Sequence, residues 1–218
     1  KKETIKLFDV KKNIKVIPNF VDFSKHMHHN KDCDRRFIAR DDEKIISHVS
    51  NFRKVKRTLD VIDIFYNIQK EVNSKLIMVG DGPERLKCMK KCKELGIIEK
   101  VKFIGNSNQV YEILCYSDLF LLPSEIESFG LSALEAMMLK VPIISTNVGG
   151  LPEVNVEGVS GFLFNLGDIQ KMSLKAIEVL KDDILLKKMK DGAHNTAKKY
   201  DIKKIIPQYE EVYKLFSK

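Results

Sequence analysis

Two glutamates, Glu127 and Glu135, stand at the ends of the stretch ESFGLSALE, eight positions apart. A carboxylate only accepts hydrogen bonds, so each of them suits a partner that carries hydroxyl groups. Gly130 lies between them at the expected start of a helix, where free backbone amides form an anion site that a ligand can approach closely. This arrangement would suit a ligand with hydroxyl groups on either side of a phosphate, and sugars supply such hydroxyls.

The segment 130–139, GLSALEAMML, is apolar nearly all round when it is wound as a helix. Such a helix is typically buried, and a carboxylate buried in it without partners would be costly. Glu135 therefore needs a partner, which is either a ligand or a protein group such as a lysine or the amides of a neighbouring helix. For Glu127, in the turn before the helix, the alternative to a ligand contact is an exposed charge.

The elements that must position these residues follow from the hydrophobic pattern. From residue 44 onward, short apolar runs alternate with longer amphipathic segments. Nearly continuous apolar strands joined by helices predict a parallel sheet covered on both faces, which is a doubly wound α/β domain of Rossmann type. The expected strands are 44–50, 75–80, 101–105, 118–123, 141–146 and 161–164, and the clearest helices are 55–72 and 83–96.

We divide the chain into three parts. Residues 1–43 are expected to be an inter-domain strand, in KVIPNFVD (15–22), followed by a charged linker. Residues 44–167 form the Rossmann-like domain, and residues 168–218 add two or three helices to it. Because the chain begins with Lys1 and a mostly polar stretch, we expect it to be a piece of a longer polypeptide.

In an open parallel sheet, ligands bind beyond the carboxyl ends of the strands. The residues to consider are therefore those that directly follow each strand. The first such stretch, 51–57, contains four cations, and the stretch 124–130 contains Glu127.

Composition excludes several classes of function. The net charge of +8 favours anionic partners, but the lysines are spread over helix surfaces without a nucleic-acid motif, so we expect no nucleic acid. No apolar run approaches the roughly 20 residues of a membrane span. The four cysteines show no paired CxxC spacing, which predicts reduced thiols in a cytoplasmic protein; they are Cys33, Cys88, Cys92 and Cys115.

Several weaker patterns are better explained without ligands. DCD (32–34) spells a metal-binding DxD, and three histidines stand at 26, 28 and 29, but we interpret both as part of a solvated loop. His48, inside an expected strand, is typical of a core histidine with satisfied hydrogen bonds. GDGP (80–83) is too short for a dinucleotide fingerprint. The pair Gly149 and Gly150 fits either a turn or the lining of a pocket.

The motifs together resemble a known family. ESFGLSALE fits the E-x7-E signature of retaining glycosyltransferases with two facing Rossmann domains, the GT-B type. The stretch continues as EAMMLKVPIISTNVGGLPEV, and VGDGPE (79–84), VKFIG (101–105) and EGVSGFLF (157–164) follow the family's order. The resemblance covers nearly the whole chain.

One motif departs from the family's pattern. Where the family usually has G-R-L-x-x-x-K-G, this chain reads SNFRKVKR (50–57). Lys56 matches the diphosphate-binding lysine, whereas Asn51 stands in place of the arginine, and Arg53 is a candidate to supply the missing cation. SNFRKVKR and PNFVD are closest to a branch that transfers N-acetylglucosamine to L-malate in bacillithiol biosynthesis.

The resemblance implies a role for each matched residue. Glu135 would accept hydrogen bonds from the ribose of a nucleotide sugar, and Glu127 would hold hydroxyls of the transferred sugar, without acting as an acid/base pair. Lys56 and Arg53 would neutralise the diphosphate, and with Glu127 they form the expected catalytic set. The expected donor-binding set is Glu135, Ser128, Phe129, Gly130, Leu131, Asn51, Gly105 and Asn106, with the uracil edge at 104–106.

The implied partners are a uridine-diphosphate sugar, an acceptor such as L-malate, and an N-terminal Rossmann domain that precedes this chain. No metal or other cofactor is implied. The sequence leaves open the oligomeric state, a homo-oligomer included. It also leaves open two other functions: a related transferase acting on a lipid or polysaccharide, and a non-catalytic nucleotide-binding module.

Overall fold

A computed structural model of the chain describes residues 8–9, 14–24 and 35–216. The DCD motif (32–34), the histidines at 26, 28 and 29, and Cys33 lie outside these residues. Three free cysteines lie within them, of which Cys88 and Cys92 are buried and Cys115 is exposed. No helix in the described ranges is long and apolar enough to cross a membrane.

Six strands form one parallel sheet in the order β3-β2-β1-β4-β5-β6. All six expected strands are present, with boundaries shifted by no more than two residues, and the Rossmann-like fold class is confirmed. The order reverses between β1 and β4, and the crevice at such a switch point is where open α/β sheets bind ligands. The strands are β1 (Lys44–Val49), β2 (Ser74–Val79), β3 (Val101–Gly105), β4 (Leu119–Leu122), β5 (Ile143–Thr146) and β6 (Gly161–Phe164).

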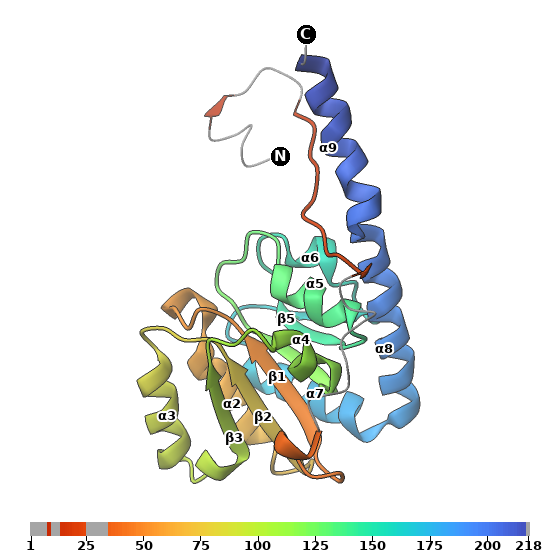
Figure 1. Cartoon of the computed structure of the whole chain (residues 1–218). Helices are drawn as coiled ribbons and strands as arrows, with labels where there is room; N and C mark the ends of the chain where they lie inside the picture. Colours follow the sequence, from red (N-terminus) through yellow and green to blue (C-terminus); the bar gives the residue numbers. More distant parts are fainter. Residues whose placement is uncertain (1–7, 10–13, 25–34, 217–218) are drawn as a thin grey trace.

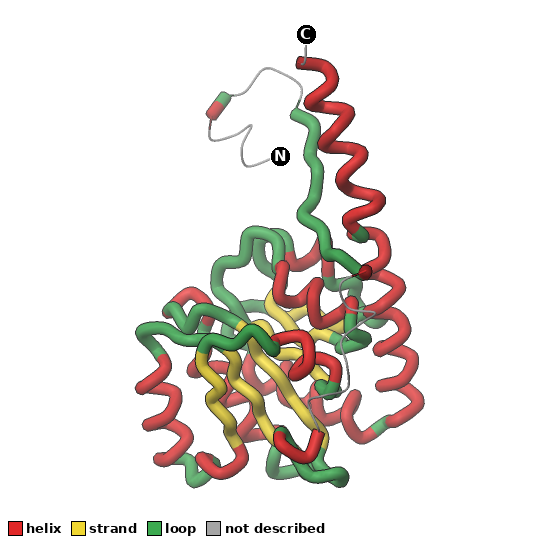
Figure 2. The backbone as a smooth tube through the Cα atoms, viewed as in Figure 1, coloured by secondary structure: helices red, strands yellow, loops and turns green. Residues whose placement is uncertain are grey.

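Helices cover both faces of the sheet (Figures 1 and 2). The α-helices are α2 (Thr58–Ile68), α3 (Arg85–Glu94), α4 (Val110–Cys115), α5 (Leu131–Met138), α6 (Leu151–Val154), α7 (Ile169–Lys181), α8 (Asp183–Ala197) and α9 (Ile202–Phe216). Short 3-10 helices are η2 (Arg35–Phe37), η3 (Lys54–Lys56), η4 (Ile98–Lys100) and η5 (Lys198–Tyr200). The last helix, α9, projects away from the sheet (Figure 1).

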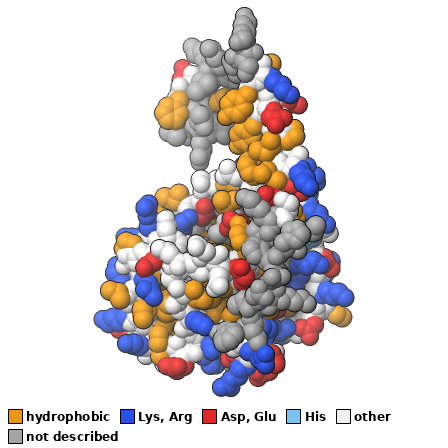
Figure 3. All heavy atoms as spheres, in the orientation of Figure 1, with side chains coloured by type: hydrophobic (Ala, Val, Ile, Leu, Met, Phe, Trp, Pro, Cys, Tyr) orange, Lys and Arg blue, Asp and Glu red, His pale blue; other side chains and the backbone are white. Residues whose placement is uncertain are grey.

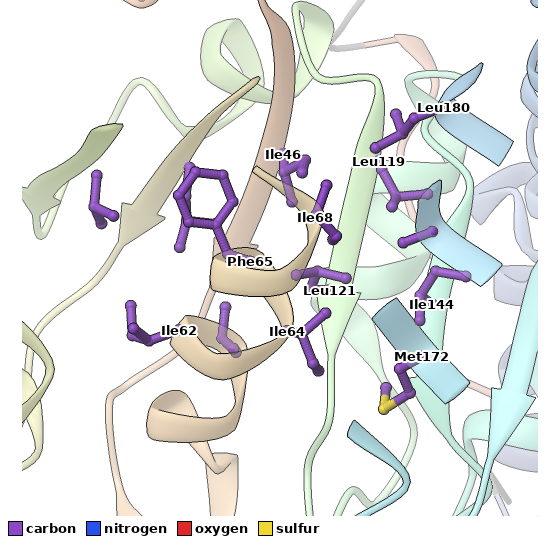
Figure 4. Packing of buried hydrophobic residues seen from close by; sticks show 14 of the residues in the cluster. Ile46, Ile62, Ile64, Phe65, Ile68, Leu119, Leu121, Ile144, Met172 and Leu180 are labelled. Atoms are coloured by element: carbon purple, nitrogen blue, oxygen red, sulfur yellow. The ribbon is translucent and has the colours of Figure 1, made fainter. Parts of the chain in front are cut away.

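Alternate residues of each strand supply different layers of the core, as a buried parallel sheet requires. On one face, Ile46, Leu119 and Leu121 pack against α2 and α7 (Figure 4). On the other face, Phe120 and Leu122 pack against α5, α6 and α8. The centre of the sheet is therefore fully packed on both faces beneath the crevice of the switch point.

The helix expected over 55–72 begins later than predicted. Residues 54–56 form η3, and α2 starts at Thr58 because Arg57 has a left-handed backbone conformation with φ +52°. A left-handed residue interrupts the regular helix. The consequence is a tight loop between β1 and α2 that carries the four cations.

The strand expected within 15–22 is not formed. Val21 makes only an isolated bridge to Asp201, with its N–H donating to Tyr200 O (3.0 Å) and its O accepting from Ile202 N–H (2.9 Å). No strand of the sheet lies beside this segment, which instead runs along α9 (Figure 1). Within the expected linker, Ile38 and Ala39 are buried against the residues of β1 and β2.

Candidate active site

The loops after β1 and β4 meet at the switch point of the sheet. Lys56 Nζ lies 2.6 Å from Glu127 Oε2, in an ion pair whose side chains are only 20% and 11% exposed. A backbone hydrogen bond from Glu125 N–H to Val55 O (2.8 Å) joins the same loops. The structure thus brings two of the three expected catalytic residues together, and it corrects the alternative that Glu127 is an exposed charge.

Two glycines of GDGP allow the loop after β1 to fold tightly. A Cβ atom on Gly80 would lie 1.8 Å from Ser50 O, and one on Gly82 would lie 2.3 Å from Asn51 O. Phe52, in the middle of the loop, is fully buried at φ +32°, and its O accepts from Glu84 N–H at 3.0 Å. The GDGP turn therefore packs directly against the backbone of the cation-bearing loop.

The entrance of α5 is built around Gly130, which has φ +91°. The first helical hydrogen bond runs from Leu134 N–H to Gly130 O (3.0 Å), so the amides of the first turn lack an intrahelical acceptor. A Cβ atom at Gly130 would lie 2.7 Å from Leu151 Cδ2. Glycine is therefore required for conformation and for packing against α6, a reason that sequence analysis did not find.

The other expected contacts at this entrance differ in exposure. The Phe129 side chain is buried edge-on against Tyr200, with ring centroids 5.7 Å apart, so only its backbone is available to a ligand. Ser128 is exposed, and Leu131 is 43% exposed.

Glu135 is half-buried and has a protein partner. The Tyr111 hydroxyl in α4 donates a hydrogen bond to Glu135 Oε1 at 3.0 Å. Burial raises the pKa of Glu135, and the hydrogen bond from Tyr111 partly opposes that effect. Burial and the carboxylate together raise the pKa of Tyr111 to about 12. A lysine or helix amides were the examples of a protein partner that we considered as the alternative to a ligand, and no pattern in the sequence singled out a tyrosine 24 positions away.

A pocket of about 430 Å³ opens at the carboxyl ends of β1 and β2. Asn51 and Asn106, two members of the expected donor-binding set, both line it, together with Val110 of α4, the neighbour of Tyr111. Gly105, with φ +76°, ends β3 at the same place, and its O accepts from Gly80 N–H at 2.8 Å. The full lining is Val49, Ser50, Asn51, Val79, Gly80, Asn106, Ser107, Asn108 and Val110.

A second pocket of the same volume lies at the amino ends of β2 and β3, where Lys75 and Lys102 line it. We favour the first pocket as the site because ligands of parallel sheets bind at the carboxyl ends, and because Asn51 in its lining belongs to the same loop as Lys56.

Arg53 is not part of the Lys56 and Glu127 ion pair; its side chain is exposed at the start of η3. Basic side chains in general are spread over the face shown in Figure 3 rather than gathered into one patch. Across the described ranges, no three His, Cys, Asp or Glu side chains cluster closely enough to hold a metal ion.

Gly149 and Gly150 pack against the loop that carries Glu127. A Cβ atom on Gly149, which has φ +55°, would lie 1.7 Å from Glu127 O, and one on Gly150 would lie 2.5 Å from Ser128 O. Gly150 N–H also donates to Glu127 O at 3.0 Å. The two glycines thus fix the backbone of Glu127.

Comparison with known proteins places the chain in a family of glycosyltransferases. Residues 30–196 match the family described as glycosyl transferases group 1, and the chain belongs to that family. The chain is 42% identical over 216 residues to N-acetyl-alpha-D-glucosaminyl L-malate synthase of Bacillus anthracis. The aligned region covers 97% of this chain and 56% of that protein. The chain therefore spans about half the length of this relative.

Solved structures agree on the fold. A variant of TarM from S. aureus, crystallised with Fondaparinux, alpha-GlcNAc-glycerol and UDP, superimposes with a TM-score of 0.82 at 24% identity, over 97% of this chain and 41% of TarM. HepE from Anabaena, in complex with UDP and glucose, gives a TM-score of 0.84 at 23% identity, over 92% of this chain and 56% of HepE. These likenesses establish a GT-B type Rossmann-like domain.

Proposed function

We propose that this chain is the donor-binding half of a retaining glycosyltransferase that transfers N-acetylglucosamine from UDP-N-acetylglucosamine to L-malate in the cytoplasm. One observation carries the donor chemistry: the ion pair of Lys56 and Glu127 joins the loop after β1, which also lines the pocket through Asn51, to the loop that leads into α5. A cation, free amides and carboxylates then lie along one edge of the sheet, as a nucleotide sugar requires.

Each part of the donor has a proposed contact. The uracil edge meets residues 104–106 and Asn51 in the pocket. The ribose hydroxyls donate to Glu135, whose second partner, Tyr111, orients the carboxylate. The sugar hydroxyls donate to Glu127, and the backbone amides of 128–131 meet the sugar and the phosphates.

The chemistry is stabilisation of a leaving group. As the bond between the sugar's anomeric carbon and the β-phosphate oxygen breaks, negative charge builds on the diphosphate. Lys56 and the amides of the α5 entrance are already in place to offset that charge. Arg53, which is exposed at the start of η3, would add a second cation by turning toward the phosphates. The acceptor hydroxyl bonds to the anomeric carbon on the same face, and its proton passes to a phosphate oxygen.

The choice of L-malate rests on the Bacillus anthracis relative and on the stretch SNFRKVKR (50–57). The acceptor site and the remaining catalytic groups would belong to a Rossmann domain that precedes this chain in a longer protein. No metal takes part in the proposed reaction.

Calorimetric titration of the chain with UDP-N-acetylglucosamine, UDP and ADP tests the donor assignment. We expect both uridine ligands to bind and ADP to give little heat. Glu135→Gln serves as the matched variant, because it preserves shape while removing the charge that accepts the ribose hydroxyls. Equal affinity for ADP and UDP, or no effect of Glu135→Gln on UDP, would reject the assignment.

The acceptor is tested in the full-length protein, by comparing transfer to L-malate with transfer to lipid and polysaccharide acceptors. Transfer to malate alone supports the proposal. Preference for either of the other acceptors would assign the chain to a different branch of the family.

A further inference from the structure

His48 in β1 is fully buried, and both of its ring nitrogens have partners. Nδ1 lies 2.8 Å from Leu121 O in the neighbouring strand β4, and Nε2 lies 2.8 Å from Ser50 Oγ. The ring stacks on Phe120, with centroids 6.3 Å apart. The expectation of a satisfied core histidine thus fits these contacts, but one of its partners belongs to the cation-bearing loop.

The direction of these hydrogen bonds follows from chemistry. A carbonyl oxygen only accepts, so Nδ1 must carry the hydrogen that points to Leu121 O. In a neutral ring, Nε2 then accepts, and the Ser50 hydroxyl donates to it. Burial keeps the ring neutral, because it lowers the pKa of His48 to about 4, an effect to which the charge of Lys56 adds.

Ser50 connects His48 to the loop after β1 through a second hydrogen bond. Its Oγ accepts a hydrogen bond from Phe52 N–H at 3.3 Å, and Phe52 is held at φ +32°, where non-glycine residues are strained. The turn of η3 follows directly, and it ends on Lys56. A chain of three hydrogen bonds therefore runs from the β4 backbone to the strained centre of the loop.

We propose that His48 is a positioning residue for the donor diphosphate: through Ser50 it holds residues 50–57 in the conformation that presents Lys56 to the phosphates. This inference rests on the proposed function. His48 is buried and touches no ligand in this proposal. Its loss should nevertheless weaken binding of the diphosphate part of the donor more than binding of the nucleoside part.

The test compares UDP with uridine, by calorimetry on the 218-residue chain. His48→Asn keeps a donor for Leu121 O and loses the acceptor for Ser50, whereas Ser50→Ala removes the hydroxyl. For each variant we expect UDP affinity to fall about three- to tenfold, the value of one hydrogen bond, with a smaller loss for uridine. The double variant should lose no more than either single variant, since both break the same chain.

Ser47→Ala is the matched control. Its hydroxyl also links buried β1 to the β4 backbone, at 3.5 Å from Leu119 O, but it does not reach the loop. We expect the ratio of UDP to uridine affinity to stay at the wild-type value.

The outcomes separate the positioning role of His48 from the proposed function. Equal losses for UDP and uridine in both variants, or no loss, would overturn the positioning role while wild-type UDP binding upholds the proposed function. If the wild-type chain binds no UDP, both fall together. Should His48→Asn fail to fold, Ser50→Ala still decides, because its side chain lies at the rim of the core.

Discussion

At the scale of single residues, the ion pair of Lys56 and Glu127 links two loops from a mostly buried position. Lys56→Met leaves the Glu127 carboxylate 11% exposed without its cation. We expect the free energy of unfolding to fall by about 1.5–3 kcal/mol, the value of a hydrogen bond to a charged group. Urea unfolding measures this change in the free energy of unfolding. The double variant Lys56→Met with Glu127→Gln should be more stable than Lys56→Met alone, because it no longer leaves an unpaired carboxylate. Additive losses would mean that the pair is not coupled.

The two glutamates should differ in what they recognise. Glu135→Gln removes the charge that accepts ribose hydroxyls, so we expect UDP to bind about ten- to a hundredfold more weakly. Glu127→Gln should change free UDP little and mainly reduce the preference for UDP-N-acetylglucosamine. Side-by-side calorimetry measures both, and equal effects on free UDP would contradict the assigned roles.

The pKa of Glu135 adds a pH dependence to this contact. Because burial raises that pKa above the usual 4.5, the carboxylate gains its proton at a higher pH than an exposed glutamate would. UDP affinity should therefore fall as the pH drops through the raised pKa, since a protonated carboxyl accepts less well. In Glu135→Gln the affinity should be low and should not show this step. Titrations in matched buffers across the acid range measure it.

At this scale the sequence pointed to candidate residues but not to all of the side chains that contact them. Glu135 stood out because a carboxylate in an apolar helix needs a partner. Glu127 stood out by its place in the turn before that helix, and Lys56 by its match to the family's diphosphate-binding lysine. The hydrogen bond between Tyr111 and Glu135, and the one between His48 and Ser50, depend on the packing of separate elements and leave no trace in local periodicity.

At the scale of elements, β1 and β4 are joined by a histidine that stays neutral. An unfolded histidine binds a proton below about pH 6.5, whereas folded His48 does so only near a pKa of about 4. Between these values the unfolded state binds more protons, so stability is lost as the pH falls. We expect a loss on the order of 2–3 kcal/mol between pH 7 and 4.5, absent from His48→Asn. Urea unfolding at both values measures it.

The loop before α6 supports the loop before α5. Ala at position 149 would meet Glu127 O at 1.7 Å, so Gly149→Ala must displace one of the two loops. Gly158→Ala is a matched control: its φ of +70° carries the same backbone strain, but nothing lies within 4 Å of the added Cβ. In both variants the free energy of unfolding should fall by about 1–2 kcal/mol, because alanine is strained in the left-handed conformation. Only Gly149→Ala should lower the free energy of unfolding further and also weaken binding of UDP-N-acetylglucosamine.

The elements themselves were predictable to different degrees. The six strands stand out because buried parallel strands are continuous apolar runs between amphipathic helices. The strand expected in 15–22 failed because an apolar run needs a neighbouring strand, and only an isolated bridge to Asp201 is available. The late start of α2 depends on the left-handed Arg57, which no residue preference indicated.

At the scale of the whole molecule, the six-stranded sheet and the helices on both of its faces belong to this chain, so we expect the chain to bind a donor. Because the proposed acceptor site lies in another domain, we expect the chain to turn over none. A ligand that binds only the folded state at a hundred times its Kd stabilises that state by about 2.7 kcal/mol. For a domain of 218 residues this corresponds to a rise in Tm of about 5–10 °C. Thermal unfolding with saturating UDP, against ADP as the control, measures the rise. Release of UDP from UDP-N-acetylglucosamine in the presence of L-malate should stay at background. Turnover by this chain alone would show that it carries its own acceptor site, and an equal rise with ADP would show that the pocket does not select uracil.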